Sequence, residues 1–231
     1  MHAMRATRRA GRGLLGSILS VRRASSLISP VDRDAFQRDG FLLRHNVLPA
    51  ADALALADHF EELFEGHFPT GIYPDEWHWR KGISRSGAMR EIVNGWKSSP
   101  AVASVALSAA LGRAASELMG WDDGCRIGQD DVLWKPAGGA GVGFHRDSAY
   151  ISDQFVQRDD ASVTVWLALD DADEETGTIE YASGSHRWPV DDRTAGSSAF
   201  HGAEDLLAPA RAAADAAGAE LDLRQLMVPR G

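Results

Sequence analysis

The sequence is poor in cysteine and has no long uninterrupted apolar stretch. Its 231 residues contain one cysteine, Cys125, so an internal disulfide is impossible, and a disulfide scaffold or a cysteine-rich zinc module is excluded. No run of about 18 apolar residues occurs, so we expect no membrane span. The chain is 44% hydrophobic and 25% charged, which is typical of a folded globular protein and excludes a coiled coil, a collagen and a wholly disordered chain.

Acidic side chains are missing from residues 1–31, which carry six arginines and a charge of +6. The remaining 200 residues carry 18 basic and 33 acidic side chains, a net charge of −15, so we expect no nucleic-acid partner. Arg-rich, Ser-containing, acid-free segments are typical of organelle transit peptides. We therefore expect residues 1–31 to be a disordered transit-like segment leading to a mitochondrial or other organelle matrix, and residues 32–231 to form the domain. The alternative is a disordered tail on a cytoplasmic protein.

Helical and strand-like patterns divide the domain into two halves. Apolar periodicity and stop signals predict helices at 32–40, 50–65 and 100–119. Short strand-like runs, separated by Gly- and Asp-rich turns, lie at 41–43, 125–135, 143–147, 162–169, 178–181 and 221–228. The Ala-rich segment 203–218 favours a helix interrupted at Pro209 and Gly218. This order predicts an α+β protein with a mainly β core, built as an antiparallel sandwich or barrel.

The triplet His145-Arg146-Asp147 is the first candidate site. On a strand, residues two apart share a face, so an extended segment would project His145 and Asp147 together and Arg146 away from them. One imidazole and one carboxylate supply two thirds of the facial triad that holds non-haem Fe(II). A solvated ion pair at a strand end has the same sequence, so the triplet is weak evidence by itself.

Three flanking features strengthen this interpretation. Lys135-Pro136 and a glycine-rich loop precede His145, a Trp-containing strand follows it, and Gly177 leads to a Gly-Ser-His turn at 184–186. As an ordered set, these motifs closely resemble the phytanoyl-CoA dioxygenase family of Fe(II)/2-oxoglutarate-dependent oxygenases. The segment 34–41 also resembles the N-terminal opening of that family, and the resemblance covers roughly residues 32–231.

The resemblance implies a double-stranded β-helix, or jelly roll, with N-terminal helices packed on one side. It implies that His145 and Asp147 bind iron and that Gln129, Trp166 and Lys97 contact 2-oxoglutarate. Their structural alternatives are a solvent-facing strand residue, a core tryptophan and an exposed lysine. The implied reaction uses O2 to hydroxylate a small or acyl-type organic substrate, while 2-oxoglutarate is decarboxylated to succinate.

The family pattern continues with a distal histidine, the third iron ligand, and an arginine for the far carboxylate of 2-oxoglutarate. No histidine follows His201 in this sequence. We therefore expect the C-terminal strands of the jelly roll to be missing, and the lack of the distal histidine and arginine leaves it open whether the chain as it stands is active. A truncated gene model, a short isoform without catalysis and a site completed by His186 or His201 remain open, although turn geometry favours a structural role for His186.

Two other functions compete with an oxygenase. A non-catalytic jelly-roll module that binds a ligand or a partner is the main alternative, and a cupin-like metalloenzyme is disfavoured because no His-x-His pair occurs. The resemblance places Tyr150 at the mouth of the site. The loops 66–95 and 148–161 are expected to surround that mouth, and their aromatic residues, including Trp77, Trp79 and Trp96, favour a partly apolar substrate.

Overall fold

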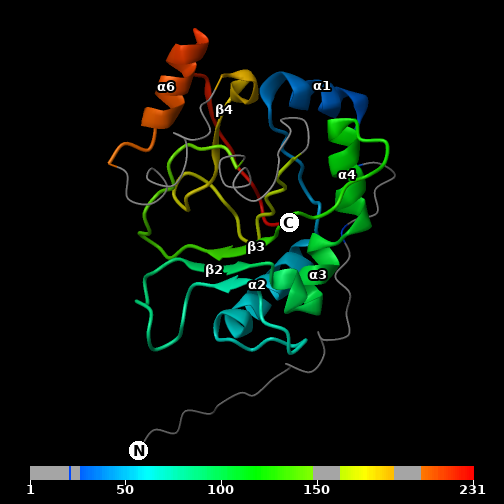
Figure 1. Ribbon diagram of the computed structural model, residues 1–231, viewed down its shortest axis with the longest axis vertical. Coiled ribbons are helices and arrows are strands. Elements are labelled where there is room, and N and C mark those ends of the chain that lie inside the picture. The colour runs from blue at the N-terminus through cyan, green and yellow to red at the C-terminus, as the bar shows by residue number, and fades with distance from the viewer. Residues whose placement is uncertain (1–20, 22–26, 148–161, 190–203) are drawn as a thin grey trace, which may run out of the picture.

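Five α-helices, two short 3-10 helices and five strands make up the described part of the chain, which in this computed structural model is residue 21 and residues 27–147, 162–189 and 204–231 (Figure 1). The helices are α1 (Pro30–Asp39), α2 (Ala50–Phe64), η2 (Gly95–Lys97), α3 (Pro100–Ala106), α4 (Ala109–Met119), η3 (Ser185–Arg187) and α6 (Ala208–Ala217). The strands are β1 (Glu76–Trp77), β2 (Arg90–Val93), β3 (Asp131–Trp134), β4 (Glu180–Ala182) and β5 (Leu223–Gln225). Most of the transit-like segment lies outside the described residues.

Two antiparallel sheets organise the described residues. One has the strand order β1-β2-β3, and the other pairs β4 with β5. The bridge between Ala172 and Val228 lies outside the named strands. Helices α2 and α3 lie beside the three-stranded sheet, whereas α1, α6 and β4 lie toward the opposite end of the molecule (Figure 1). The α+β class is therefore confirmed.

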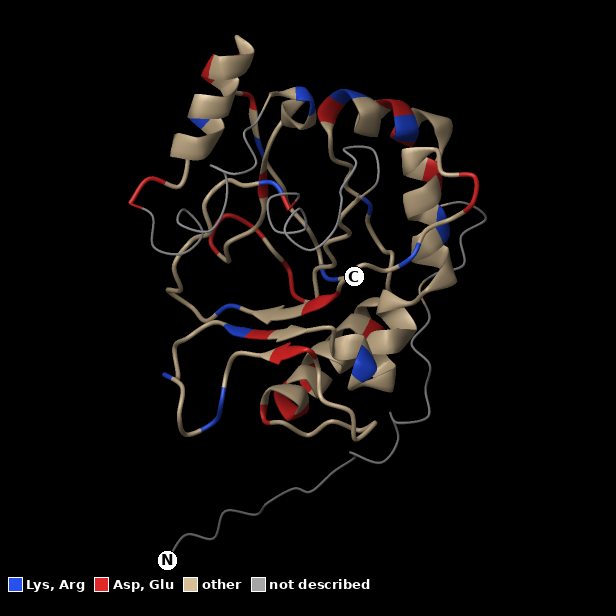
Figure 2. Cartoon of the chain, viewed as in Figure 1, with Lys and Arg blue, Asp and Glu red and all other residues tan. Residues whose placement is uncertain are grey.

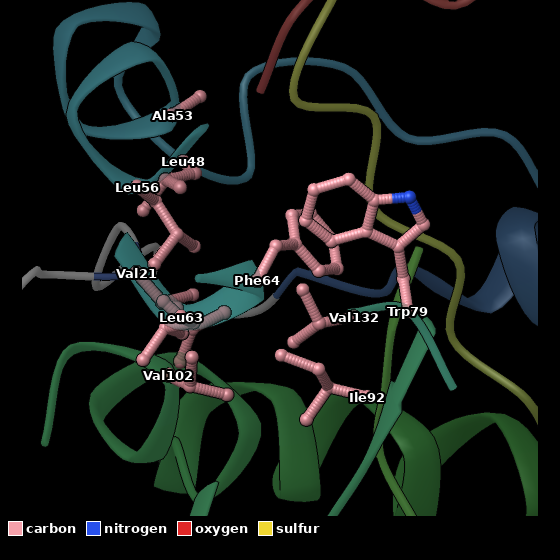
Figure 3. Close-up of a cluster of buried hydrophobic side chains, with 11 residues drawn as sticks. Val21, Leu48, Ala53, Leu56, Leu63, Phe64, Trp79, Ile92, Val102 and Val132 are labelled. Carbon is pink, nitrogen blue, oxygen red and sulfur yellow. The ribbon is translucent and has the colours of Figure 1, made fainter. Parts of the chain in front are cut away.

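The core forms where one face of the three-stranded sheet meets α2 and α3 (Figure 3). Ile92 and Val132 face each other across β2 and β3 and are 0% and 3% exposed. Leu63 and Phe64 from α2 and Val102 from α3 cover them. Val21, which precedes the expected domain boundary at residue 32, is also buried in this cluster. Since side chains alternate along a strand, the residues on either side of Val132 point to the other face.

Local capping signals define α1 as the sequence suggests. The Ser29 hydroxyl accepts a hydrogen bond from the Asp32 amide, and the Asp32 carboxylate accepts one from the Ser29 amide, which forms a capping box. Gly40 ends the helix with φ 84°, in the left-handed region that glycine adopts without strain. The expected helix at 32–40 is thus confirmed, with its start two residues earlier.

The expected helix at 100–119 is wrong as a single element. Ser108 accepts a hydrogen bond from the Ala110 amide and caps a second helix, so the segment divides into α3 and α4. Taken together, Pro100–Met119 has a mean hydropathy of 1.2 and is, within the described residues, the one stretch long and apolar enough to cross a membrane. Val102 and Val105 from this stretch are buried in the core, and 22% of its apolar window is buried within the protein.

The double-stranded β-helix is not confirmed, and two of its expected strands are wrong. The chain bends at Phe144 and turns at Asp147, and within the described residues 143–147 belongs to no strand; the Phe144 amide donates to the Leu206 carbonyl. The segment 162–168 is not part of a ladder. The Ala168 carbonyl, at the end of that segment, accepts a hydrogen bond from the Gly231 amide. Flanking glycines weaken strand propensity in the first segment, which accounts for the wrong prediction there.

The expected strands at 41–43 and 125–135 and the helix at 203–218 also differ. The first is not a strand, and the second is shortened to β3. Pro209 does not interrupt a helix, because it occupies the first turn of α6, where a missing amide hydrogen costs nothing.

The three tryptophans expected around the mouth of a site lie in or against the core, whereas Tyr73, expected there too, is 70% exposed and Phe155 lies outside the described residues. Trp79 is 6% exposed, and Trp77 and Trp96 pack against the buried cluster. The Arg90 guanidinium lies 4.3 Å from the ring centroids of both Trp79 and Trp134, where cation–π attraction compensates part of its desolvation. This loop therefore secures the sheet, and its tryptophans do not support an apolar substrate.

Helix α2 offers a matched test of this core. Leu63→Ala removes a side chain that is 0% exposed, and we expect it to lower the free energy of unfolding by about 3 kcal/mol. Leu54→Ala changes the same helix at a position that is 43% exposed, and we expect a loss of about 0.5 kcal/mol or less. Urea denaturation followed by circular dichroism measures both. Equal losses would contradict the burial of α2 against the sheet.

Candidate functional site

His145 and Asp147 lie side by side, as their spacing predicted. The His145 Nε2 atom is 3.4 Å from the Asp147 Oδ1 atom, and the side chains are 26% and 47% exposed. A bend and a turn, not the expected strand, bring them together. The imidazole nitrogen of His145 and a carboxylate oxygen of Asp147 therefore lie together at a solvent-accessible site.

The backbone holds the His145 ring in a ligand-like orientation. Its Nδ1 atom lies 2.8 Å from the Gly143 carbonyl oxygen, which can only accept a hydrogen bond, so Nδ1 carries the proton. The Nε2 atom is then the one directed at Asp147. Metal-binding histidines commonly have one ring nitrogen fixed by such a carbonyl, which leaves the other for the metal.

The charges of the pair support each other. Burial opposes the charged imidazole, but hydrogen bonds with Asp147 and the Gly143 carbonyl outweigh it and raise the pKa of His145. The hydrogen bond with His145 lowers the pKa of Asp147 against the effect of desolvation, and a hydrogen bond donated by the Thr164 hydroxyl lowers it further. Because the pKa of His145 is raised, metal binding at Nε2 competes with protonation of the imidazole.

Two residues at this site escaped the sequence analysis. Thr164 reaches Asp147 from the Trp-containing segment. Tyr181, on β4, stacks on Phe41 with ring centroids 4.8 Å apart, and burial together with the charge of Asp147 raises the pKa of its hydroxyl. Both contacts join segments distant in sequence, and no local pattern could have revealed them.

Arg146 anchors the triplet from the opposite side. Its guanidinium donates to the Ser185 carbonyl and, at 2.8 Å, to the Trp188 carbonyl, so it grips the η3 turn. That turn in turn contacts α1, because His186 Nε2 and Arg187 Nη1 lie 3.2 and 3.1 Å from the Gln37 carbonyl oxygen. His186 therefore lies against α1, in the structural role that turn geometry favoured.

Glycine substitutions test this docking of η3 on α1. A Cβ at Gly40 would overlap the His186 ring, whereas a Cβ at Gly82 meets nothing within 4 Å, and both glycines have positive φ. We expect Gly82→Ala to cost about 1–2 kcal/mol for backbone strain alone. Gly40→Ala should cost clearly more in thermal denaturation, because the ring must also move. Equal costs would contradict the contact.

Carboxylates gather on the face of the sheet opposite the core. Acidic residues occur on all three strands β1, β2 and β3 (Figure 2). Partial burial of the Asp131 carboxylate raises its pKa to about 6; the hydrogen bond from Gln129 opposes this shift, and the charges of Glu91, Asp130 and Asp147 add to it. Gln129 Nε2 donates to both oxygens of Asp131, at 3.0 and 3.1 Å. The structure thus places Asp131, to which Gln129 is hydrogen-bonded, within electrostatic range of Asp147.

The raised pKa of Asp131 predicts a pH-dependent stability. The folded state keeps the proton up to about pH 6 while the unfolded chain loses it near 3.8, so ionisation of Asp131 destabilises the fold as pH rises. We expect Asp131→Asn to stabilise the protein by about 1 kcal/mol at pH 7.5, discounted for solvent screening. The gain in melting temperature should grow between pH 4 and 6 and then level off. A gain independent of pH would contradict this assignment.

The structure does not bring Lys97 to the pair. Its Nζ atom lies 2.7 Å from both oxygens of Asp75. Trp166 is 43% exposed, so it is not the plain core tryptophan of the alternative interpretation. Tyr150 and His201 lie outside the described residues.

A scan of family models matches the phytanoyl-CoA dioxygenase (PhyH) model to residues 36–222. The chain belongs to the phytanoyl-CoA dioxygenase family. No curated protein and no solved structure matches the chain at the required significance. Membership in the phytanoyl-CoA dioxygenase family supports a dioxygenase-type oxidoreductase, and the family suggests dependence on Fe(II) and 2-oxoglutarate.

The phytanoyl-CoA dioxygenase chemistry calls for more than the pair provides. Within 27–147, 162–189 and 204–231, no group of three His, Cys, Asp or Glu residues could hold a metal ion. His145 and Asp147 fit iron as one nitrogen and one oxygen donor. A hollow of about 540 Å³ between α1 and α4 is lined by residues such as Arg33, Arg113 and Cys125, and by none of the predicted site residues. The pair accordingly forms an open partial site.

Proposed function

We propose that this phytanoyl-CoA dioxygenase family member is an Fe(II)/2-oxoglutarate-dependent oxygenase. It hydroxylates a small or acyl-type organic substrate with O2, and 2-oxoglutarate is decarboxylated to succinate. The observation that supports this most directly is the pairing of His145 Nε2 with Asp147 Oδ1, 3.4 Å apart, within a chain whose residues 36–222 match the family.

His145 and Asp147 would hold the iron, which supplies the oxidising chemistry when bound. Displacing the proton of His145 frees Nε2 as a neutral donor, while Asp147 contributes a negative oxygen. No third protein ligand joins them within the described residues. Tyr181, with its raised pKa, stays protonated at neutral pH and can donate a hydrogen bond beside Asp147.

The co-substrate contacts are part of the same proposal. Trp166 lies two residues from Thr164 along the chain and is 43% exposed, so its indole is accessible to a ligand. Gln129 can use its amide when released from Asp131. Lys97 would have to exchange Asp75 for a carboxylate of 2-oxoglutarate, which makes it the weakest of the three contacts.

The composition of residues 1–31 supports an organelle matrix as the place of this reaction, and a cytoplasmic location is the alternative. The expected environment contains a small-molecule substrate and O2 and requires no nucleic acid.

A non-catalytic binding module is the second candidate function. The observation that favours it is the two-donor site, since the described residues bring no third metal ligand to His145 and Asp147. Two donors alone hold Fe(II) weakly, and such a chain would bind a ligand or partner without oxidising it.

Anaerobic titration separates the two candidates. We expect Fe(II) added with 2-oxoglutarate to produce a visible metal-to-ligand charge-transfer band, and O2 then to yield succinate. Asp147→Ala should abolish the band, because it removes one of the two candidate metal donors. Asp215→Ala is the matched control, since it removes an exposed carboxylate from α6 and should leave the band unchanged.

The outcomes point in different directions. Absence of the band from the wild-type chain would overturn the oxygenase proposal and favour the binding module. A band that survives in Asp147→Ala, with the far-ultraviolet circular dichroism unchanged, would place the metal elsewhere.

A further inference from the structure

The two oxygens of Asp147 have different partners. Oδ1 lies 3.4 Å from His145 Nε2, and Oδ2 accepts a hydrogen bond from the Thr164 hydroxyl, which comes from a segment 17 residues further along the chain. An aspartate carboxylate rotates broadly about its terminal bond, because the two-fold torsion has shallow minima. A donor fixed to one oxygen therefore decides where the other oxygen points.

Thr164 lies just before a segment that is fixed by packing and by backbone hydrogen bonds. Leu167 and Leu169 pack against the hydrophobic core. The Ala168 carbonyl accepts from the Gly231 amide at 2.9 Å, and the Leu169 carbonyl accepts from Arg230 Nε at 2.8 Å. The β-branched side chain of threonine also has few χ1 rotamers, so its hydroxyl has a restricted direction.

The triplet is secured independently from the other side. Arg146, between the two candidate ligands, donates to the carbonyls of Ser185 and Trp188. The Asp147 backbone is thus held by its neighbour, and rotation of the carboxylate is the freedom that remains. Thr164 removes that freedom.

We propose that Thr164 is a positioning residue that orients the Asp147 carboxylate for metal binding, by holding Oδ2 so that Oδ1 faces the same space as His145 Nε2. This inference rests on the proposed iron site and adds a residue to it. Groups that orient a metal ligand typically change metal affinity by about 10–100-fold when they are removed.

The test uses the full chain and a metal ion alone. Thr164→Val keeps the shape of the side chain and removes the hydroxyl, whereas Thr164→Ser keeps the hydroxyl. Anaerobic calorimetric titration with Fe(II), and with Co(II) as a spectroscopic probe, gives the dissociation constant for each variant. We expect Thr164→Val to weaken binding about 10–100-fold and to alter the Co(II) absorption, and Thr164→Ser to stay within about 3-fold of wild type.

Thr178→Val is the matched control. The Thr178 hydroxyl is buried and has no hydrogen-bond partner within the described residues, so the same chemical change there should leave metal affinity unaltered. Thr164 is exposed, so Thr164→Val should keep the wild-type melting temperature in the absence of metal.

Each result decides one question. A wild-type chain that binds neither metal would overturn the iron site and this inference with it. A wild-type chain that binds metal together with a Thr164→Val variant that binds equally well would overturn only the positioning role. Equal weakening in Thr164→Ser would also overturn it, because the hydroxyl would then not be the group that matters.

Discussion

The buried contact between Ile92 and Val132 is the constraint on which the arrangement of the sheet depends. The two residues face each other across β2 and β3 and are covered by α2 and α3. A shift of one residue in either strand would turn a buried apolar side chain to the opposite face, so this contact specifies the register. The same alternation directs Asp131 away from the core and toward the carboxylate of Asp147.

The candidate site is assembled by contacts that link one layer to the next. The η3 turn packs against helix α1, where His186 and Arg187 contact the Gln37 carbonyl. Arg146 in turn donates a hydrogen bond to the Trp188 carbonyl at the end of η3. His145 and Asp147, the neighbours of Arg146 in the chain, lie side by side, and the Thr164 hydroxyl donates a hydrogen bond to Asp147 there. Because Arg146 and Thr164 approach from separate segments, the position of the pair depends on the whole fold more than on local strand geometry. This explains how the pair forms although the expected strand is absent there.

Electrostatic attraction couples the two residues of the site. The pKa values of His145 and Asp147 shift in opposite directions, so each stabilises the charged form of the other. Asp131 has a raised pKa in the same region, chiefly because its carboxyl is desolvated, and the charges of neighbouring carboxylates add to the shift. A bound cation would relieve that accumulation of negative charge. The acidic face of the sheet is therefore compatible with the metal chemistry of the phytanoyl-CoA dioxygenase family.

Short-range information in the sequence determined the features whose causes are local. Ser29 and Gly40 set the ends of α1, the spacing of His145 and Asp147 predicted their proximity, and the ordered motifs identified the family. Only the tertiary structure decided the contacts of Thr164, the partner of Lys97 and the burial of Trp79. The physical reason is that a cap or an i, i+2 pair involves neighbours along the chain, whereas these three depend on segments that meet only after the core has packed.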